Sequence, residues 1–205
     1  MTSDYDLTTR EGFLHRADEM TRRRIPPRFR DATATDPAVV GWCDQLARAC
    51  SEDDLRPVPS LLITGPTGVG KTWQAYGAIR RTATSGVVIG WLASSAPDLY
   101  ALLRPRLDTD SEAEFQRWAS IPLLLLDDLG AAKDSEWTEE VLYRLVNHRN
   151  AHLLPTIYTT NLPVRGRIAG HPTLQSVVSE RVFSRLAECR LVTLKGRDRR
   201  IGSAS

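Results

Sequence analysis

The sequence predicts an α/β fold in which a five-stranded, mostly parallel sheet is flanked by helices. Short apolar segments alternate with segments of helical periodicity, which is typical of parallel strands joined by crossover helices. Residues 121–127 form one continuous apolar run, as expected of a strand buried on both faces. A glycine-rich motif also joins a predicted strand to a predicted helix. The predicted strands are 60–64, 86–93, 121–127, 155–161 and 189–195.

Helices are predicted between these strands. Asp36 is a suitable N-cap, and the proline that follows it suits the first turn of a helix. Pro105 is expected to end or kink the helix that contains it. The predicted helices are 36–50, 71–84, 96–107, 112–119, 136–152 and 173–188.

The first 24 residues are polar and carry little structural information. Phe13, Ala17 and Met20 have helical spacing, so 1–24 is either a weak amphipathic helix or a solvated arm. The prolines of 25–33 predict a loop, which we interpret as the start of the main domain.

The composition favours a globular protein and argues against disulfide-rich and membrane-spanning classes. The chain has 205 residues, is 41% hydrophobic and carries a net charge of +2, which suits one globular domain and says little about partners. Cys43, Cys50 and Cys189 are scattered, so neither a disulfide framework nor a zinc knuckle is expected. No apolar run approaches the ~18 residues of a membrane span, and the first residues lack a signal-peptide pattern. We expect a soluble, cytoplasmic protein.

The sequence GPTGVGKT matches the phosphate-loop pattern G-x-x-x-x-G-K-[ST] and has the strand-loop-helix context that the pattern requires. The glycines let backbone N–H groups face a phosphate at a helix N-terminus. Lys71 is expected to reach the β- and γ-phosphates, and Thr72 to offer its hydroxyl to Mg²⁺. ATP and Mg²⁺ are therefore the expected cofactors. The predicted nucleotide-binding residues are Gly65, Pro66, Thr67, Gly68, Val69, Gly70, Lys71 and Thr72.

A phosphate-loop enzyme needs a second acidic site to hold Mg²⁺. The stretch LLLLDDLG at 123–130 offers one, because two carboxylates follow the apolar strand. We expect Asp127 to orient the Mg²⁺ shell and Asp128 to orient the attacking water. The alternative is a charged strand end without a catalytic role.

These motifs, in this order, resemble the DnaC/IstB-like branch of AAA+ ATPases, which includes helicase loaders and transposition helper ATPases. The resemblance covers residues 25–195 and implies a phosphate-loop fold of AAA+ type with no C-terminal lid domain. It divides the chain into three parts: a short N-terminal extension at 1–24, an ATPase domain at 25–195 and a basic flexible tail at 196–205. The N-terminal extension is a candidate partner-binding helix. The segments that carry it are IPPRFRDAT, GPTGVGKT, LLLLDDLG, YTTNLP and ERVFSRL.

The resemblance also assigns roles to residues. Asn161 occupies the position of sensor 1, which senses the γ-phosphate, and Arg185 that of an arginine finger acting on a neighbouring subunit, with Arg181 as its helper. The alternative for Asn161 is that it only ends a strand. The alternative for Arg181 and Arg185 is that they form surface salt bridges. Asp128 stands where Glu is commoner in the family, and the shorter side chain either slows hydrolysis or is fully competent after a small shift.

In this branch, the helices before the acidic strand contact single-stranded DNA. Arg104 and Arg106 are the candidate phosphate contacts here, although an acidic run follows them and a solvated helix is the alternative. The basic tail either adds nonspecific DNA affinity or is inert.

The first hypothesis is therefore an ATP-hydrolysing AAA+ protein that acts on single-stranded DNA as a replicative helicase loader and self-associates into an ATP-dependent ring or helical assembly. The second is a transposase helper ATPase, which differs only in its partner. The third is a small-molecule kinase or other phosphate-loop enzyme, and the fourth a nucleotide-binding adaptor with negligible turnover.

Overall fold

The computed structural model describes residues 9–56, 58–106, 110–131, 135–166 and 171–198. The chain divides into two compact units, each described by itself below. The first comprises Met1–Val58 and Thr72–Ile89, and the second comprises Pro59–Lys71 and Gly90–Ser205.

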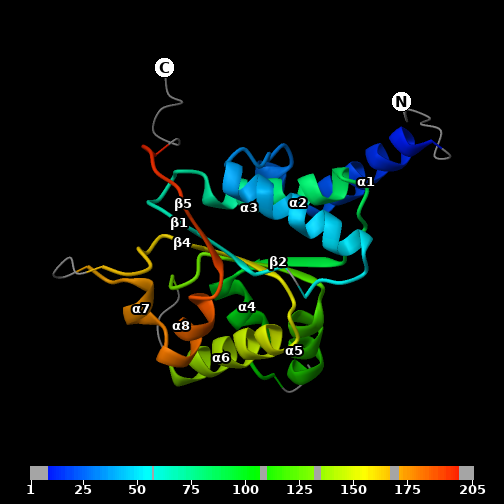
Figure 1. The fold of residues 1–205 in the computed structure, drawn as a ribbon. Coiled ribbons are helices and arrows are strands. Elements are labelled where there is room, and N and C mark those ends of the chain that lie inside the picture. The colour runs from blue at the N-terminus through cyan, green and yellow to red at the C-terminus, as the bar shows by residue number, and fades with distance from the viewer. Residues whose placement is uncertain (1–8, 57, 107–109, 132–134, 167–170, 199–205) are drawn as a thin grey trace. The chain divides into compact units, whose positions relative to one another are not determined.

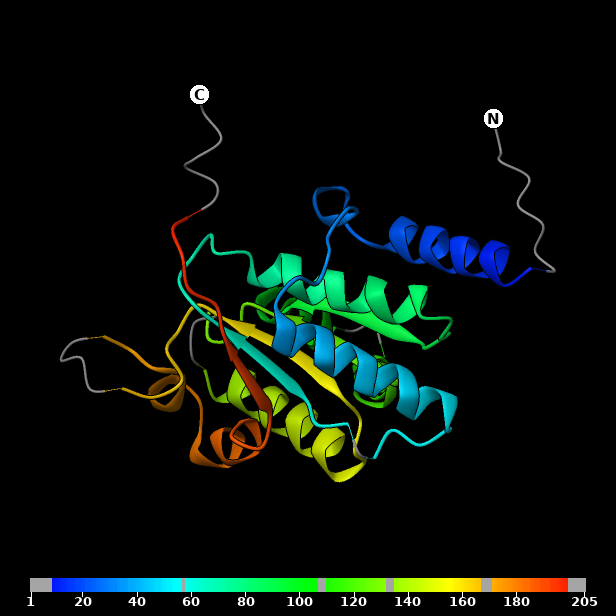
Figure 2. The same ribbon diagram turned by 45° about the horizontal axis from the view of Figure 1, so that its top comes forward.

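The second unit is built on a five-stranded sheet in which every pair of neighbouring strands is parallel. The strand order is β2-β3-β4-β1-β5, and Figure 2 shows β5, β1 and β4 side by side. The order places β4 between β1, which precedes the phosphate loop, and β3, which carries the acid pair. The strands are β1 (Leu61–Thr64), β2 (Trp91–Ser95), β3 (Leu123–Asp127), β4 (Thr156–Thr160) and β5 (Arg190–Thr193).

Helices α4, α5, α6 and α8 lie together on one face of this sheet, the lower face in Figure 1. Their apolar side chains form one core with the strands, in which Leu124, Leu126, Leu145 and Val182 are fully buried. All four leucines at 123–126 are buried, as the apolar run predicts. The helices are α4 (Ala96–Leu103), α5 (Ser111–Ser120), α6 (Glu136–Ala151), α7 (Leu174–Val177) and α8 (Glu180–Leu186).

Arg149, on α6, lies inside this core with 1% of its surface exposed. None of the described residues forms an ion pair with it. Its guanidinium instead donates to five main-chain carbonyls and to the hydroxyl of Thr156, at the amino ends of β3 and β4. Burial lowers the pKa of Arg149 to about 10. The carbonyl acceptors are those of Trp118, Ala119, Ile121, Pro122 and Pro155.

The first unit contains α1 (Arg10–Arg24), the short 3₁₀ helix η1 (Pro27–Phe29), α2 (Pro37–Ser51) and α3 (Lys71–Thr84), whose first residue belongs to the second unit. Arg80 on α3 pairs in a bidentate manner with Asp18 on α1, at 2.9 and 3.0 Å. Phe13 and Met20 of α1 are 44% and 59% exposed. An ion pair, and not these two side chains, therefore joins α1 to α3.

Three predicted boundaries were wrong. Strand β2 begins at Trp91, not at 86, and Trp91 pairs with Leu123, the first residue of β3. The helix predicted at 96–107 already ends at Leu103. The helix predicted at 173–188 is broken at Val178, which is extended, and Ser179 is the N-cap of α8.

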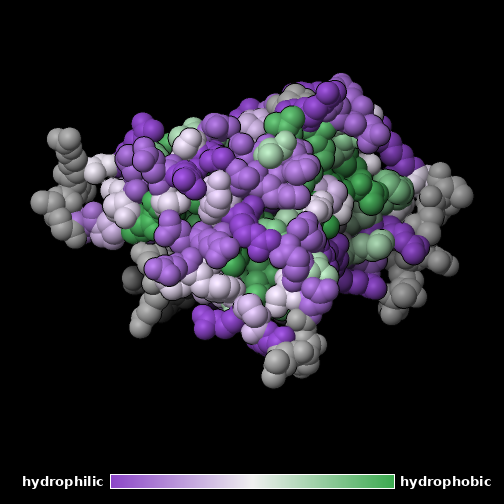
Figure 3. All heavy atoms as spheres, turned by 90° about the horizontal axis from the view of Figure 1, so that it is seen from below, coloured by the Kyte–Doolittle hydropathy of each residue, from purple (hydrophilic) through white to green (hydrophobic). Residues whose placement is uncertain are grey.

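The surface seen from below the sheet is mainly hydrophilic, with hydrophobic side chains in smaller areas (Figure 3). Among the described residues, no helix is both long enough and apolar enough to cross a membrane.

Candidate functional site

The phosphate loop joins β1 to α3 and adopts the backbone that its glycines permit. The φ angles of Gly65, Gly68 and Gly70 are 151°, 79° and 100°, values that residues with a Cβ rarely adopt. A Cβ at Gly65 would also lie 2.4 Å from the carbonyl oxygen of Leu194. Loop conformation and close packing therefore both require glycine. Pro66 and Thr67 are exposed at the tip of the loop, and Val69 is buried.

Lys71 folds back over this loop and is only 5% exposed. Its Nζ donates to the carbonyl oxygens of Gly65 at 2.9 Å and Pro66 at 2.8 Å, and to Asn161 Oδ1 at 2.6 Å. An ammonium group with three donors can exchange such acceptors for phosphate oxygens without losing its charge. Thr72, the next residue of the motif, is half-buried in α3 and belongs to the first unit.

The acid pair lies where β3 ends, and both carboxylates are half-buried. Asp127 accepts a hydrogen bond from the Thr159 hydroxyl. Asp128 Oδ1 accepts one from Asn161 Nδ2 at 3.3 Å. Because Asn161 also accepts from Lys71, the structure connects three of the predicted residues, Lys71, Asn161 and Asp128, through one amide side chain.

Asp128 has a φ of 54°, in the left-handed region. Asp and Asn adopt this conformation more readily than other residues with a Cβ, and functional sites often hold residues in it. The backbone thus gives a local reason for Asp at this position, because Glu is less suited to positive φ.

Sequence analysis did not find Thr159, which binds both members of the acid pair. Its hydroxyl donates to the Asp127 carboxylate and accepts from the Asp128 N–H at 3.0 Å. Thr160, the next residue of β4, donates to the Leu129 carbonyl oxygen at 2.7 Å. The one sequence signal was the pair of adjacent threonines directly before Asn161, at the end of a predicted strand.

The arginine pair contacts α6. The guanidinium carbons of Arg181 and Arg185 lie 5.8 and 5.7 Å from the centre of the Tyr143 ring. Arg185 also donates to Asn147 Oδ1 at 2.6 Å and to the Arg181 carbonyl oxygen at 2.9 Å. Arg181 is exposed and Arg185 half-buried. Among the described residues, neither arginine forms an ion pair with Glu180 or Glu188, so the structure does not contain the surface salt bridges of the alternative interpretation.

Arg104 and Arg106 lie just beyond the end of α4, and both are exposed. The guanidinium of Arg104 lies 5.2 Å from the centre of the Trp137 ring, and Arg106 donates to the Ala101 carbonyl oxygen at 3.3 Å. The structure does not bring them to the residues around Lys71. They form a separate basic position on the surface of the second unit.

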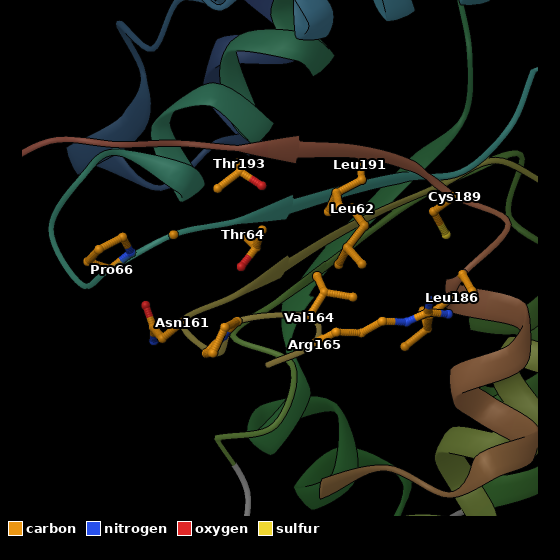
Figure 4. Close-up of a pocket in the computed structure, with 13 residues that line it drawn as sticks. Leu62, Thr64, Pro66, Asn161, Val164, Arg165, Leu186, Cys189, Leu191 and Thr193 are labelled. Carbon is orange, nitrogen blue, oxygen red and sulfur yellow. The ribbon is translucent and has the colours of Figure 1, made fainter. Parts of the chain in front are cut away.

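A cavity of about 820 Å³ lies beside the phosphate loop (Figure 4). Leu62, Leu186 and Leu191 give it apolar walls, while Pro66 and Asn161 line its other end. Its volume is typical of small-molecule sites, and its lining includes Gly65 and Pro66 of the phosphate loop.

The three cysteines are free, and burial raises the pKa of each thiol. Burial raises the pKa of the Cys43 and Cys189 thiols to about 12. Both are therefore protonated at neutral pH, which makes them poor nucleophiles.

The segment after β5 passes next to the phosphate loop. The Leu194 N–H donates to the Thr64 carbonyl oxygen at 2.8 Å. Farther along, the carboxyl group of Asp198 fills the space beside Gly68, because its atoms lie 1.9–2.5 Å from the position that a Cβ would occupy there. A carboxylate thus lies against a loop whose backbone is suited to bind anions.

Comparison with known proteins agrees with this geometry. Residues 46–204 match the sequence profile of the family described as IstB-like ATP binding protein. The chain belongs to this family. It is therefore an IstB-like ATP-binding protein with a phosphate loop, as the sequence motifs predict.

Two insertion-sequence proteins are similar in sequence. The ATP-binding protein of insertion sequence IS1162 from Pseudomonas fluorescens is 34% identical over 129 residues, 62% of this chain and 54% of that protein. The insertion-sequence ATP-binding protein y4pL from Sinorhizobium fredii is 30% identical over 126 residues, 60% of this chain and 50% of that protein. The match spans about half the length of each relative.

Two solved structures share the fold. The DnaC helicase loader has a TM-score of 0.66 at 23% identity, covering 83% of this chain and all of that one. DnaI has a TM-score of 0.66 at 19% identity, covering 87% of this chain and 98% of that one. This likeness confirms the predicted fold class, a parallel five-stranded AAA+ sheet flanked by helices.

Proposed function

We propose that the protein hydrolyses ATP with Mg²⁺ and that this ATPase serves a DNA-acting partner. The observation that carries the proposal is the link from Lys71 through Asn161 to Asp128, within hydrogen-bond distance at each step. A phosphate-binding cation, a polar sensor and a candidate acid for the attacking water thus meet at the carboxyl ends of neighbouring strands, where parallel sheets bind ligands.

The donor set at this edge suits Mg²⁺. This ion takes oxygen ligands, and protein sites usually supply one or two carboxylates while phosphates and water complete the shell. The half-buried Asp127 carboxylate is such a donor, and the Thr72 hydroxyl, which follows Lys71 directly in the chain, is the second expected ligand. No cluster of three or more acidic, His or Cys ligands occurs among the described residues, which is compatible with a metal held partly by phosphate. When bound, Mg²⁺ would neutralise charge on the phosphates.

Three residues of the chain have the remaining roles in phosphate binding and in orienting the attacking water. Lys71 exchanges the carbonyls of its own loop for phosphate oxygens, which are stronger acceptors because they are charged. Asn161 is then released from Lys71, so that its amide can bind the γ-phosphate or the attacking water. Asp128, held by Asn161 before nucleotide binds, orients and polarises that water.

Self-association completes the proposal. Arg185, assisted by Arg181, is the candidate finger for the nucleotide of a neighbouring subunit, where such an arginine stabilises transition-state charge. In the described structure Arg185 is bound by Asn147, so the finger must leave this amide to act in trans. We infer a ring or helical assembly that forms with ATP.

Two partners are candidates. The family and the insertion-sequence relatives favour a transposase helper. The fold shared with DnaC and DnaI keeps a replicative helicase loader as the second candidate. In either role, Arg104, Arg106 and the basic tail at 196–205, of which 199–205 lie outside the described residues, are the proposed contacts to single-stranded DNA.

Equilibrium binding and turnover of ATP test the proposal. Wild type should bind ATP, hydrolyse it with Mg²⁺ and show activity per subunit that rises with protein concentration and with single-stranded DNA. Lys71→Ala should bind ATP about 10–100-fold more weakly, whereas Arg185→Ala should bind ATP normally but hydrolyse it slowly. Normal ATP binding by Lys71→Ala would overturn the site, and wild-type activity of Arg185→Ala would overturn action in trans.

A pull-down with ATP present tests the partner. The baits are a transposase encoded beside this gene and a replicative helicase, and the Lys71→Ala protein is the control. Retention by the transposase alone supports the helper role, and retention by the helicase alone supports the loader role.

A further inference from the structure

Thr159 occupies a position that none of the motifs assigns. It lies in β4 with 0% of its surface exposed, two residues before Asn161. Its hydroxyl donates to Asp127 Oδ1 and accepts from the Asp128 N–H at 3.0 Å. Its own carbonyl oxygen accepts from the Leu129 N–H at 2.8 Å. One residue therefore contacts three consecutive residues of the acidic segment.

The direction of these hydrogen bonds is determined by chemistry. A main-chain N–H only donates, so the Thr159 oxygen must accept from Asp128 and is left to give its single proton to Asp127. This arrangement suits the ionised form of Asp127, which only accepts. The hydroxyl therefore holds Oδ1 of Asp127 in one orientation.

The second contact bears on the backbone. Asp128 has a φ of 54°, a conformation that persists only when the surroundings determine it. The hydrogen bond from its N–H to the Thr159 hydroxyl is one such restraint. Rotation of the Asp127 side chain and of the Asp128 backbone is therefore restrained by the same oxygen atom.

We propose that Thr159 is a positioning residue for the acid pair: it fixes the Asp127 carboxylate for Mg²⁺ and the Asp128 backbone for the attacking water. The inference rests on the proposed function. Residues that orient a metal ligand from behind typically change metal affinity by about 10–100-fold when removed. Thr159 is expected to act in the same way, without touching nucleotide itself.

The neighbouring Thr160 offers a matched control. It is also in β4 and 0% exposed, but its hydroxyl donates to the main-chain carbonyl oxygen of Leu129 at 2.7 Å. Thr→Val at either position removes a buried hydroxyl of the same strand and preserves side-chain shape. Only the change at Thr159 removes a partner of the Asp127 carboxylate.

The experiment compares wild type with Thr159→Val, Thr159→Ser and Thr160→Val. The first readout is the half-saturating Mg²⁺ concentration. It is found by measuring the affinity for a non-hydrolysable ATP analogue at increasing Mg²⁺ and taking the concentration at which half of the gain in affinity is reached. The second is the melting temperature, and the third is kcat at saturating Mg²⁺. For Thr159→Val we expect at least a 10-fold higher half-saturating Mg²⁺ concentration and a lower kcat. Thr159→Ser should restore both to within about threefold of wild type.

Thr160→Val should lower the melting temperature about as much as Thr159→Val without raising the Mg²⁺ requirement. Equal Mg²⁺ requirements for Thr159→Val and Thr160→Val would overturn the inference while leaving the proposed function intact. A wild type whose affinity for the analogue is independent of Mg²⁺ would overturn the metal-dependent function and the inference together. Failure of Thr159→Ser to restore the Mg²⁺ requirement would also overturn the role of the hydroxyl.

Discussion

Lys71 and Arg149 are two buried cations of the second unit, and each donates hydrogen bonds to main-chain carbonyl oxygens at opposite ends of the same sheet. Lys71 is bound at the carboxyl ends of the strands by two carbonyls of its own loop and by one amide side chain. Arg149 is bound near the amino ends by five carbonyls and one hydroxyl. The first set contains acceptors that a phosphate can replace, whereas the second joins α5, β3, α6 and β4.

The difference shows that the acceptors around a buried cation indicate whether it binds a ligand or stabilises the fold. The ammonium group of Lys71 is compact and can rotate toward a new acceptor, whereas the planar guanidinium of Arg149 matches several carbonyls at once. A buried cation whose acceptors come from several segments is therefore expected to stabilise the fold, and one that binds its own loop is expected to serve a ligand.

The largest effect is expected at Arg149. Arg149→Met should lower the free energy of unfolding by about 3 kcal/mol or more, because each buried acceptor left without a donor costs about 1–3 kcal/mol. Arg149→Lys should lower the free energy of unfolding by less, because lysine keeps the positive charge although it lacks the several N–H donors of the planar guanidinium. Urea denaturation measures both. A loss below about 1 kcal/mol for Arg149→Met would show that the carbonyls find other donors and would remove the contrast with Lys71.

Asp128→Asn tests the end of the link that begins at Lys71. Asn keeps the shape and the tolerance for positive φ but cannot accept a proton from water. Turnover should fall about 100-fold or more, as expected for loss of a general base, while ATP affinity and melting temperature stay near wild type. Single-turnover kinetics measures the effect. Unchanged turnover would favour the adaptor alternative, in which hydrolysis is negligible from the start.

Lys71→Ala should reverse the pattern of Arg149→Met. Loss of charged hydrogen bonds to phosphate should weaken ATP binding by about 10–100-fold, whereas the free energy of unfolding should change by less than about 1 kcal/mol. Calorimetry and urea denaturation measure the two quantities. A loss of stability as large as that of Arg149→Met would mean that Lys71 also holds the fold.

The smallest effect is expected at Asp198. Its carboxylate lies against Gly68, so like charges should oppose phosphate binding at the loop. Asp198→Asn should therefore tighten ATP binding by about threefold to 10-fold, an effect that weakens with added salt. Titration with ATP at low and high salt measures it. Weaker binding by the variant would instead assign Asp198 a supporting role at the site.

Much of this arrangement follows from sequence patterns. Helix α3 has the predicted bounds, and the apolar run at 123–126 is buried as expected, because hydrophobic periodicity and the phosphate-loop motif are local signals. The break at Val178 was not predicted, because the sequence around it remains compatible with one continuous helix. It appears only when α7 and α8 are seen as separately capped elements.

Sequence patterns named the residues of the candidate site one by one, but not the contacts between them. Asn161 and Asp128 could be named from their positions after strands, yet their contact with each other depends on the order of β3 and β4 in the sheet. Thr159 and Arg149 were missed for a related reason. Thr is a common strand residue and Arg a common helix residue, so nothing in the local pattern reveals which side chains will be buried.

The cradle around Arg149 also bears on the order of folding. Its acceptors lie 6 to 31 residues away in the chain, whereas Lys71 and Asn161 are separated by 90. Contacts between residues close in sequence lose less entropy on closing and form earlier than distant ones. On the ribosome, every group that binds Arg149 has been made once residue 156 has been added. The α5–β3–α6–β4 segment can therefore be held together before β5 exists, and the nucleotide site closes around a part that is already formed.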